Sequence, residues 1–160
     1  MRGSRFWLVV AMLLVPSAAA ADGHRAIFFG ISFSNGSLLT GVHGTFDAGL
    51  TGDRVAIVGD LSWHTGDGTD RTMYAAGLRF LPGYSRKSTS RHLVSVHALV
   101  GGAREFGDNS AVFGGGAAYE AVLRRTANAR VSLRIQGDVF GRTGSLDPFG
   151  RVSVLLGGRW

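Results

Sequence analysis

Hydrophobic and polar residues alternate along most of this chain. From Arg130 to Asp138 every second residue is polar and most residues between them are apolar, and the segment 151–160 repeats the pattern. A period of two gives a β-strand one polar and one apolar face. Eight segments follow this pattern: 25–34, 38–47, 54–64, 72–81, 92–103, 111–123, 130–140 and 151–160.

Turn-forming residues separate these segments, and a helical pattern is missing. Asn35 and Gly36 form a strong signal for a tight hairpin turn. No stretch after residue 22 carries an apolar stripe at helical spacing. Each segment is close to the roughly 9–11 residues that a tilted strand needs to cross a bilayer. The sequence therefore predicts an all-β chain that folds as an eight-stranded antiparallel up-and-down transmembrane β-barrel.

The first part of the chain differs from the rest. Two arginines precede an apolar run at 6–15, and small residues follow it up to Ala21. This order is typical of a secretory signal peptide, and the run is well short of the roughly 20 residues that a membrane-spanning helix needs. We therefore expect a signal peptide at 1–21 and a barrel domain at 22–160, located in the outer membrane of a Gram-negative-type envelope.

If the N-terminus lies in the periplasm, the order of the segments also predicts the side of each connection. The expected outer loops are 34–37, 65–71, 104–110 and 142–148. The expected periplasmic turns are 48–53, 82–91 and 124–129. The turn at 82–91 is as long as any of the outer loops, which is unusual for this orientation.

A soluble barrel is the main alternative. A lipocalin-like secreted or periplasmic barrel would show the same alternation with its apolar face inside, where it would bind a ligand. Two features favour the membrane. The polar face mixes arginine and carboxylates with serine, glycine and histidine, as a narrow lumen would. Tyr74, Tyr119 and Trp160 fall on the apolar face, where aromatic girdles lie in outer-membrane barrels.

Many of the arginines fall inside the strand-like segments rather than in loops. Arginine supplies 16 of the 17 basic residues, and they are spread along the chain rather than clustered as in a nucleic-acid-binding protein. The lumen of an eight-stranded barrel is filled by side chains, and buried charges require partners. We expect an ion-pair network in the lumen made of Arg54, Asp60, Arg79, Glu120, Arg130, Arg134, Asp138 and Arg151, with Arg159 on the same face.

Ser95, His97 and Gln136 lie on the same polar faces, and we expect them to be polar lumen residues. A structural role in envelope integrity follows from a filled, charged lumen. A second alternative is a narrow porin-like channel in which arginines gate the passage of ions or small solutes.

No catalytic motif emerges from the sequence. Ser95 and His97 share a strand face, as do Ser62 and His64, but both pairs lie on the polar side, away from any lipid substrate. The chain contains no cysteine. We therefore expect neither an enzyme nor a metal or cofactor site, and we expect a monomer whose partners are outer-membrane lipid and, during biogenesis, the barrel assembly machinery.

Three stretches resemble the OmpA/OmpX-like family of small outer-membrane barrels. They are 55–63 (VAIVGDLSW), 75–79 (AAGLR) with 97–104 (HALVGGAR), and 113–116 (FGGG) followed by 134–138 (RIQGD). The resemblance implies an outer-membrane barrel and says little about activity. It also implies that the final strand, which ends on Trp160 where the family usually has phenylalanine, carries the signal for assembly into the membrane.

Overall fold

The eight predicted segments all form β-strands. The computed structural model describes residues 24–34, 39–50, 54–66, 68–84, 89–144 and 147–160. The expected signal peptide at 1–21 and the Asn35 and Gly36 turn lie outside these residues. The strands are β1 (Arg25–Ser34), β2 (Leu39–Gly49), β3 (Val55–Gly66), β4 (Thr69–Phe80), β5 (His92–Glu105), β6 (Asp108–Arg125), β7 (Arg130–Arg142) and β8 (Phe149–Arg159).

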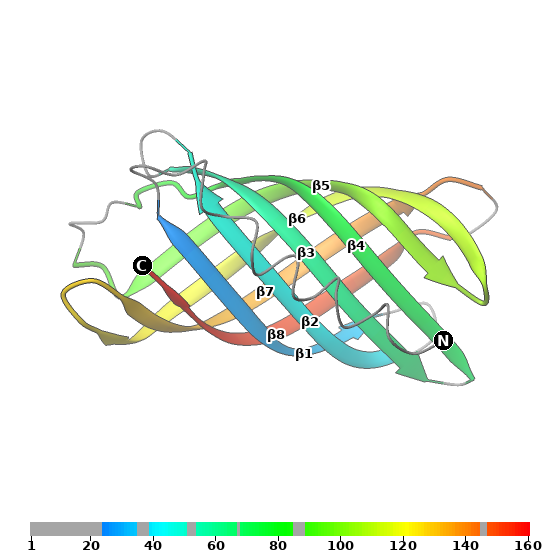
Figure 1. The fold of residues 1–160 in the computed structure, drawn as a ribbon, viewed down its shortest axis with the longest axis horizontal. Coiled ribbons are helices and arrows are strands. Elements are labelled where there is room, and N and C mark those ends of the chain that lie inside the picture. Colours follow the sequence, from blue (N-terminus) through cyan, green and yellow to red (C-terminus); the bar gives the residue numbers. More distant parts are fainter. Residues whose placement is uncertain (1–23, 35–38, 51–53, 67, 85–88, 145–146) are drawn as a thin grey trace, which may run out of the picture.

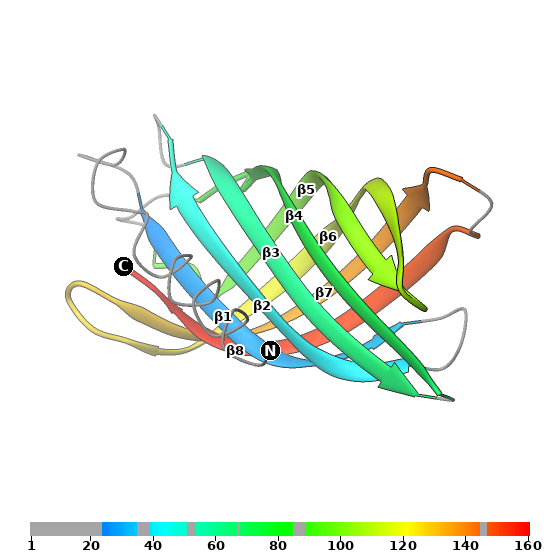
Figure 2. The ribbon, with the colours of Figure 1, turned by 45° about the vertical axis from the view of Figure 1, so that its right-hand side comes forward.

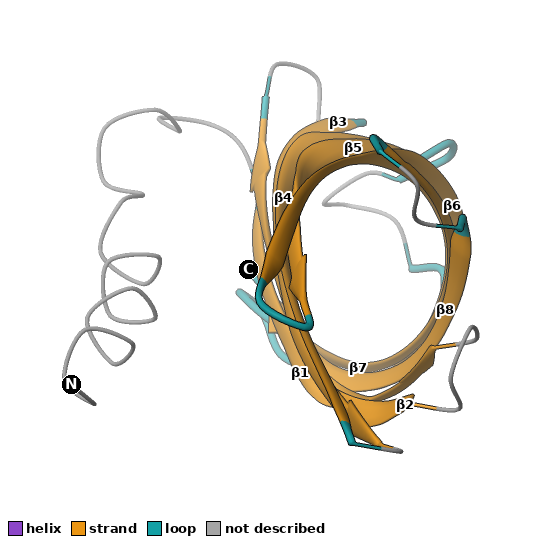
Figure 3. Cartoon of the chain, turned by 90° about the vertical axis from the view of Figure 1, so that its right-hand side faces the viewer, coloured by secondary structure: helices purple, strands orange, loops and turns teal. Residues whose placement is uncertain are grey.

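The strands close into a single barrel. Each strand pairs antiparallel with the next one along the chain, and β8 pairs with β1 to complete the ring (Figure 1). The long, tilted strands are also visible in the rotated view (Figure 2), and the view along the barrel shows an elliptical cross-section (Figure 3). The eight-stranded antiparallel barrel predicted from the alternation is therefore confirmed. None of the described residues belongs to a helix long and apolar enough to span a membrane.

The alternation sorts side chains between the two sides of the barrel wall. The largest fully buried side chains include Arg79, Arg134, Arg151 and Arg159. The exterior carries large exposed apolar side chains on all eight strands, among them Ile31, Val42, Ile57, Leu78, Val100, Phe113, Val139 and Leu156. The barrel is thus polar inside and apolar outside.

Two of the connections are shorter than the sequence suggested. The expected loop 65–71 is wrong, because β3 continues to Gly66 and β4 begins at Thr69. The expected loop 104–110 is also wrong, because Glu105 pairs with Asp108 across a two-residue turn. Phe106 and Gly107 in this turn have φ values of 52° and 89°, the backbone conformation of a tight type I′ hairpin. In both places, polar and glycine-rich sequence forms strand ends rather than loops.

Inward-facing glycines allow neighbouring strands to approach closely. A Cβ atom added to Gly116 would lie 1.9 Å from the carbonyl oxygen of Gly137 and 2.6 Å from Oδ1 of Asp138. A glycine in a strand often marks a tight bend or a close approach of another backbone. Gly116 therefore leaves room for the Asp138 carboxylate in the barrel interior.

The close approach at Gly116 can be tested by adding one methyl group. Gly116→Ala should lower the free energy of unfolding by about 1–3 kcal/mol, because the added atom forces the backbone to shift in a packed interior. Gly137→Ala is the control, since a Cβ added there meets nothing within 4 Å. Urea unfolding of the barrel from lipid vesicles measures both, and equal midpoints would contradict the close approach.

Candidate functional site

A bidentate ion pair lies at the centre of the barrel interior. The Nη1 and Nη2 atoms of Arg151 donate to the two carboxylate oxygens of Asp60 at 2.7 and 2.8 Å. The Nε and Nη2 atoms of Arg151 also donate to Oδ2 of Asp138, at 2.8 and 2.6 Å. The planar guanidinium therefore serves two carboxylates from strands β3 and β7 at once.

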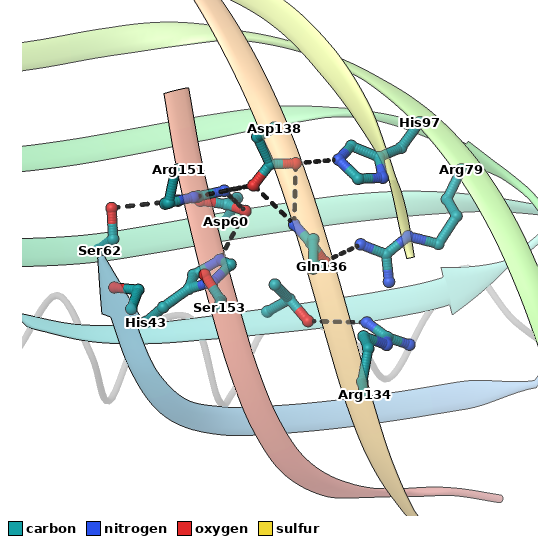
Figure 4. A network of polar contacts seen from close by, with 12 residues as sticks. His43, Asp60, Ser62, Arg79, His97, Arg134, Gln136, Asp138, Arg151 and Ser153 are labelled. Carbon is teal, nitrogen blue, oxygen red and sulfur yellow. Dashed lines mark hydrogen bonds and ion pairs between the residues drawn. The ribbon is translucent and has the colours of Figure 1, made fainter. Parts of the chain in front are cut away.

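Two histidines and a glutamine extend this central cluster (Figure 4). Nε2 of His43 lies 2.8 Å from Oδ2 of Asp60, and Nε2 of His97 lies 2.6 Å from Oδ1 of Asp138. The side-chain amide of Gln136 donates to Asp138 and its oxygen accepts from Arg79, 3.0 Å away. The central cluster thus joins five strands through side chains alone.

A second cluster lies nearer the end of the barrel where β1 begins and β8 ends. Nη1 of Arg79 and Nη2 of Arg134 donate to Oδ2 of Asp47 at 2.9 and 3.0 Å. Nη2 atoms of Arg134 and Arg159 both donate to Oε2 of Glu120, at 3.3 and 3.1 Å. All five side chains are almost fully buried. Two carboxylates are therefore shared among three arginines in this part of the interior, so positive charge is in excess there.

A third cluster closes the opposite end of the interior. Arg71 makes a bidentate pair with Glu105 at 3.0 and 2.9 Å and donates to Oγ of Ser34 at 2.7 Å. Arg142 donates to the same carboxylate. The guanidinium carbons of Arg71 and Arg142 each lie 4.4 Å from the ring centre of Phe149, a cation–π geometry.

Aromatic rings also support the arginines near the end where β1 begins and β8 ends. The guanidinium of Arg134 lies 3.6 Å from the ring centre of Phe28. Arg130 and Arg159 lie 5.2 and 5.1 Å from the ring centre of Tyr84. A ring face attracts a cation and fills space beside it, so these contacts hold guanidinium groups where carboxylates are scarce.

The structure brings most of the predicted site residues together. The buried set contains Asp60, Arg79, Glu120, Arg130, Arg134, Asp138 and Arg151, together with Ser95, His97 and Gln136. Arg54 is a correction, because its side chain is exposed. Strand β3 begins only at Val55, and Arg54 uses its carbonyl oxygen to accept from the backbone of Leu81 at the barrel end.

The sequence reasoning missed several members of these clusters. Asp47 and His43 share the inward face of β2, and the alternation within 38–47 could have identified both. Arg71 and Glu105 fall in the predicted loops 65–71 and 104–110, but both lie near the ends of strands β4 and β5. Correct strand lengths would have placed them on the polar face.

One group of contacts has the connectivity of a hydrolase triad. Nδ1 of His43 lies 2.8 Å from Oγ of Ser153, and its Nε2 faces Asp60. All three residues are buried, and Asp60 is already held by Arg151. A nucleophile needs access to substrate and a stabilising site for the oxyanion, so this arrangement supports structure rather than acyl transfer. Within the part of the chain that the structure describes, no group of three histidine or acidic side chains is placed to hold a metal ion.

The central ion pair gives a sharp stability prediction. Arg151→Met should lower the free energy of unfolding by about 3–5 kcal/mol, because two buried carboxylates lose their shared cation. Arg54→Met is the matched control and should change stability by less than about 0.5 kcal/mol, because Arg54 is exposed. Guanidinium unfolding followed by tryptophan fluorescence measures both.

Additional substitutions separate charge pairing from packing at Arg151. Adding Asp60→Asn and Asp138→Asn to Arg151→Met removes the uncompensated charges and should recover part of the lost stability. A triple variant no more stable than Arg151→Met alone would show that packing, rather than charge pairing, dominates at this position.

The fold is shared with known membrane proteins, although the sequence is not. No protein-family model and no curated protein matches the chain. The structure is similar to neisserial surface protein A, with a TM-score of 0.63 and 15% identity over 85% of this chain and 94% of that chain. It is also similar to the outer membrane protein OprG from Pseudomonas aeruginosa, with a TM-score of 0.52 and 10% identity over 86% of this chain and 94% of that chain. A third similar structure is Ail, the attachment invasion locus protein of Yersinia pestis, with a TM-score of 0.50 and 15% identity over 86% of this chain and 99% of that chain. The fold is therefore that of small eight-stranded outer-membrane barrels.

Proposed function

We propose that this protein is an outer-membrane β-barrel with a structural role in the integrity of the envelope. The observation that carries the proposal is the inverted arrangement of side chains, with buried arginines and carboxylates inside and exposed apolar residues outside on every strand. A closed barrel satisfies all of its strand-to-strand hydrogen bonds, which is the condition for crossing lipid. Outer-membrane lipid then covers the exterior band.

The soluble lipocalin-like alternative fits this arrangement poorly. A soluble barrel would point its apolar face inward and its charges into water. Here Val100 and Val139 are 65% and 67% exposed, while Arg79 and Asp60 are fully buried. If this barrel were dissolved in water, its apolar exterior would be exposed to water while its charged side chains were buried away from it. Both effects are unfavourable.

A filled interior favours a structural role over conduction. The three clusters follow one another along the barrel and draw side chains from every strand. Moving an ion through this space would require the breaking of buried ion pairs. The narrow porin-like channel is therefore the second candidate function.

The proposal includes a route into the membrane. Trp160 closes the barrel by exchanging two backbone hydrogen bonds of 2.8 Å with Arg25, and its side chain is about half exposed. An exposed aromatic at the end of the last strand suits recognition by the barrel assembly machinery. A monomer is sufficient for this role, because the closed barrel leaves no strand edge unpaired.

A charged substitution on the exterior tests the membrane location. Val100→Arg should reduce the stability of the barrel in lipid by about 2–4 kcal/mol, because it places a cation in the hydrocarbon. Phe106→Arg is the control, since Phe106 is equally exposed but lies in a turn at the barrel end. The measurements are recovery in the outer-membrane fraction and the shift in gel mobility on boiling. Equal behaviour of the two variants, or recovery of the wild type without detergent, would overturn the proposal.

Conductance separates the two candidate functions. The wild-type barrel in a planar bilayer should show no single-channel steps, because its interior is filled by paired charges. Arg151→Met provides the comparison, since it loosens the central cluster. Regular steps from the wild type would favour the channel.

A further inference from the structure

The two ends of the barrel carry opposite exposed charge. Among the described residues, the end where β1 begins and β8 ends exposes Arg54, Arg91, Arg124 and Arg125 and no carboxylate. The opposite end exposes Asp70, Asp108 and Asp147, with Arg104 as the exposed cation there. Exposed charges interact with the ionic groups at a membrane surface, so the two ends suit different surroundings.

A hollow lies within the basic end, between the beginning of β5 and the end of β6. Its volume is about 420 Å³, and it is lined by Thr89, Arg91, Val122, Leu123, Arg124 and Arg125. Three of these six residues are arginines, and no carboxylate is among them. A binding site for an anionic group needs this composition.

A β-bulge shapes the hollow. The register between β6 and β7 shifts between Val122 and Arg124, which leaves Leu123 without a partner and 62% exposed. Bulges bend a strand and re-aim its side chains. The backbone is held by a bond from Val122 to the carbonyl of Arg91, and Arg125 donates to the carbonyl of Ser90. The bulge therefore places an apolar side chain directly beside the arginines.

An aromatic pair lies next to the hollow on the apolar exterior. The rings of His92 and Tyr119 stack with centroids 5.8 Å apart, and the Tyr119 hydroxyl contacts Nδ1 of His92. Aromatic residues with polar tips gather at the boundary between hydrocarbon and headgroups. Arg124 and Arg125 lie further along β6 than Tyr119, toward the barrel end.

We propose that this hollow binds the phosphate headgroup of an anionic phospholipid in the leaflet at the end where β1 begins and β8 ends. The inference rests on the proposed membrane location. Arg91, Arg124 and Arg125 would contact the phosphate, while the exposed Leu123 would contact the start of the acyl chains. The apolar part of the lining distinguishes a lipid from a free phosphate ion.

Lipid retention tests the proposal. The full barrel is folded in micelles containing equal amounts of phosphatidylglycerol and phosphatidylcholine, and retained lipid is counted by native mass spectrometry. The wild type should retain phosphatidylglycerol preferentially. The variant R91Q/R124Q/R125Q should lose roughly five-fold in affinity for each arginine and on the order of 100-fold in total. The matched variant R25Q/R54Q/R104Q removes the same charge elsewhere and should keep the preference.

Three results would overturn the site. Equal retention of both lipids by a barrel that still shifts on boiling would reject the hollow and leave the membrane location intact. Equal losses in the two triple variants would assign the preference to overall charge. Full displacement of phosphatidylglycerol by inorganic phosphate at similar concentration would identify a free-anion site. Failure of the wild type to fold in any lipid or micelle would instead reject the proposed function and the site with it.

Discussion

Every other feature of this barrel depends on the pairing of charges that water cannot reach. An eight-stranded barrel is too narrow to keep a water-filled lumen, so its inward side chains must fill the space and satisfy one another. Arg151 meets this requirement by serving Asp60 and Asp138 together. His43 shares Oδ2 of Asp60 with Arg151, and His97 contacts Oδ1 of Asp138. These contacts connect strands that are distant in the sequence, so they fix the barrel's shape as well as its charge balance.

The polarity of the interior is linked to the polarity of the barrel's exterior. With period-two alternation, each strand that sends arginine inward sends valine, leucine or an aromatic outward. The apolar exterior is then a consequence of the charged interior, and both become favourable only in lipid. Glycines such as Gly116 complete the arrangement, because they leave space for carboxylates where neighbouring strands approach most closely.

The sequence predicted the strands and their faces well, because alternation is a local property. The segment 25–34 matches β1 at both ends. The ends of other strands were harder to predict, because hairpin turns of two residues allow polar, glycine-rich sequence to continue the ladder. Arg71 and Glu105 were lost for this reason, and Arg54 was misplaced because β3 begins one residue after it. Which arginine meets which carboxylate depends on the register around the closed ring, and that register is not a local property.

The distribution of charge along the barrel links the interior to the rim. Four buried arginines, Arg79, Arg130, Arg134 and Arg159, share their part of the interior with the two carboxylates of Asp47 and Glu120. The excess of positive charge therefore begins inside the wall and continues onto the exposed arginines at the same end. The opposite end exposes mainly aspartates. A membrane surface rich in anionic lipid attracts the first end and repels the second. The exposed charges, rather than the buried ones, would therefore favour one orientation of the barrel in an asymmetric bilayer.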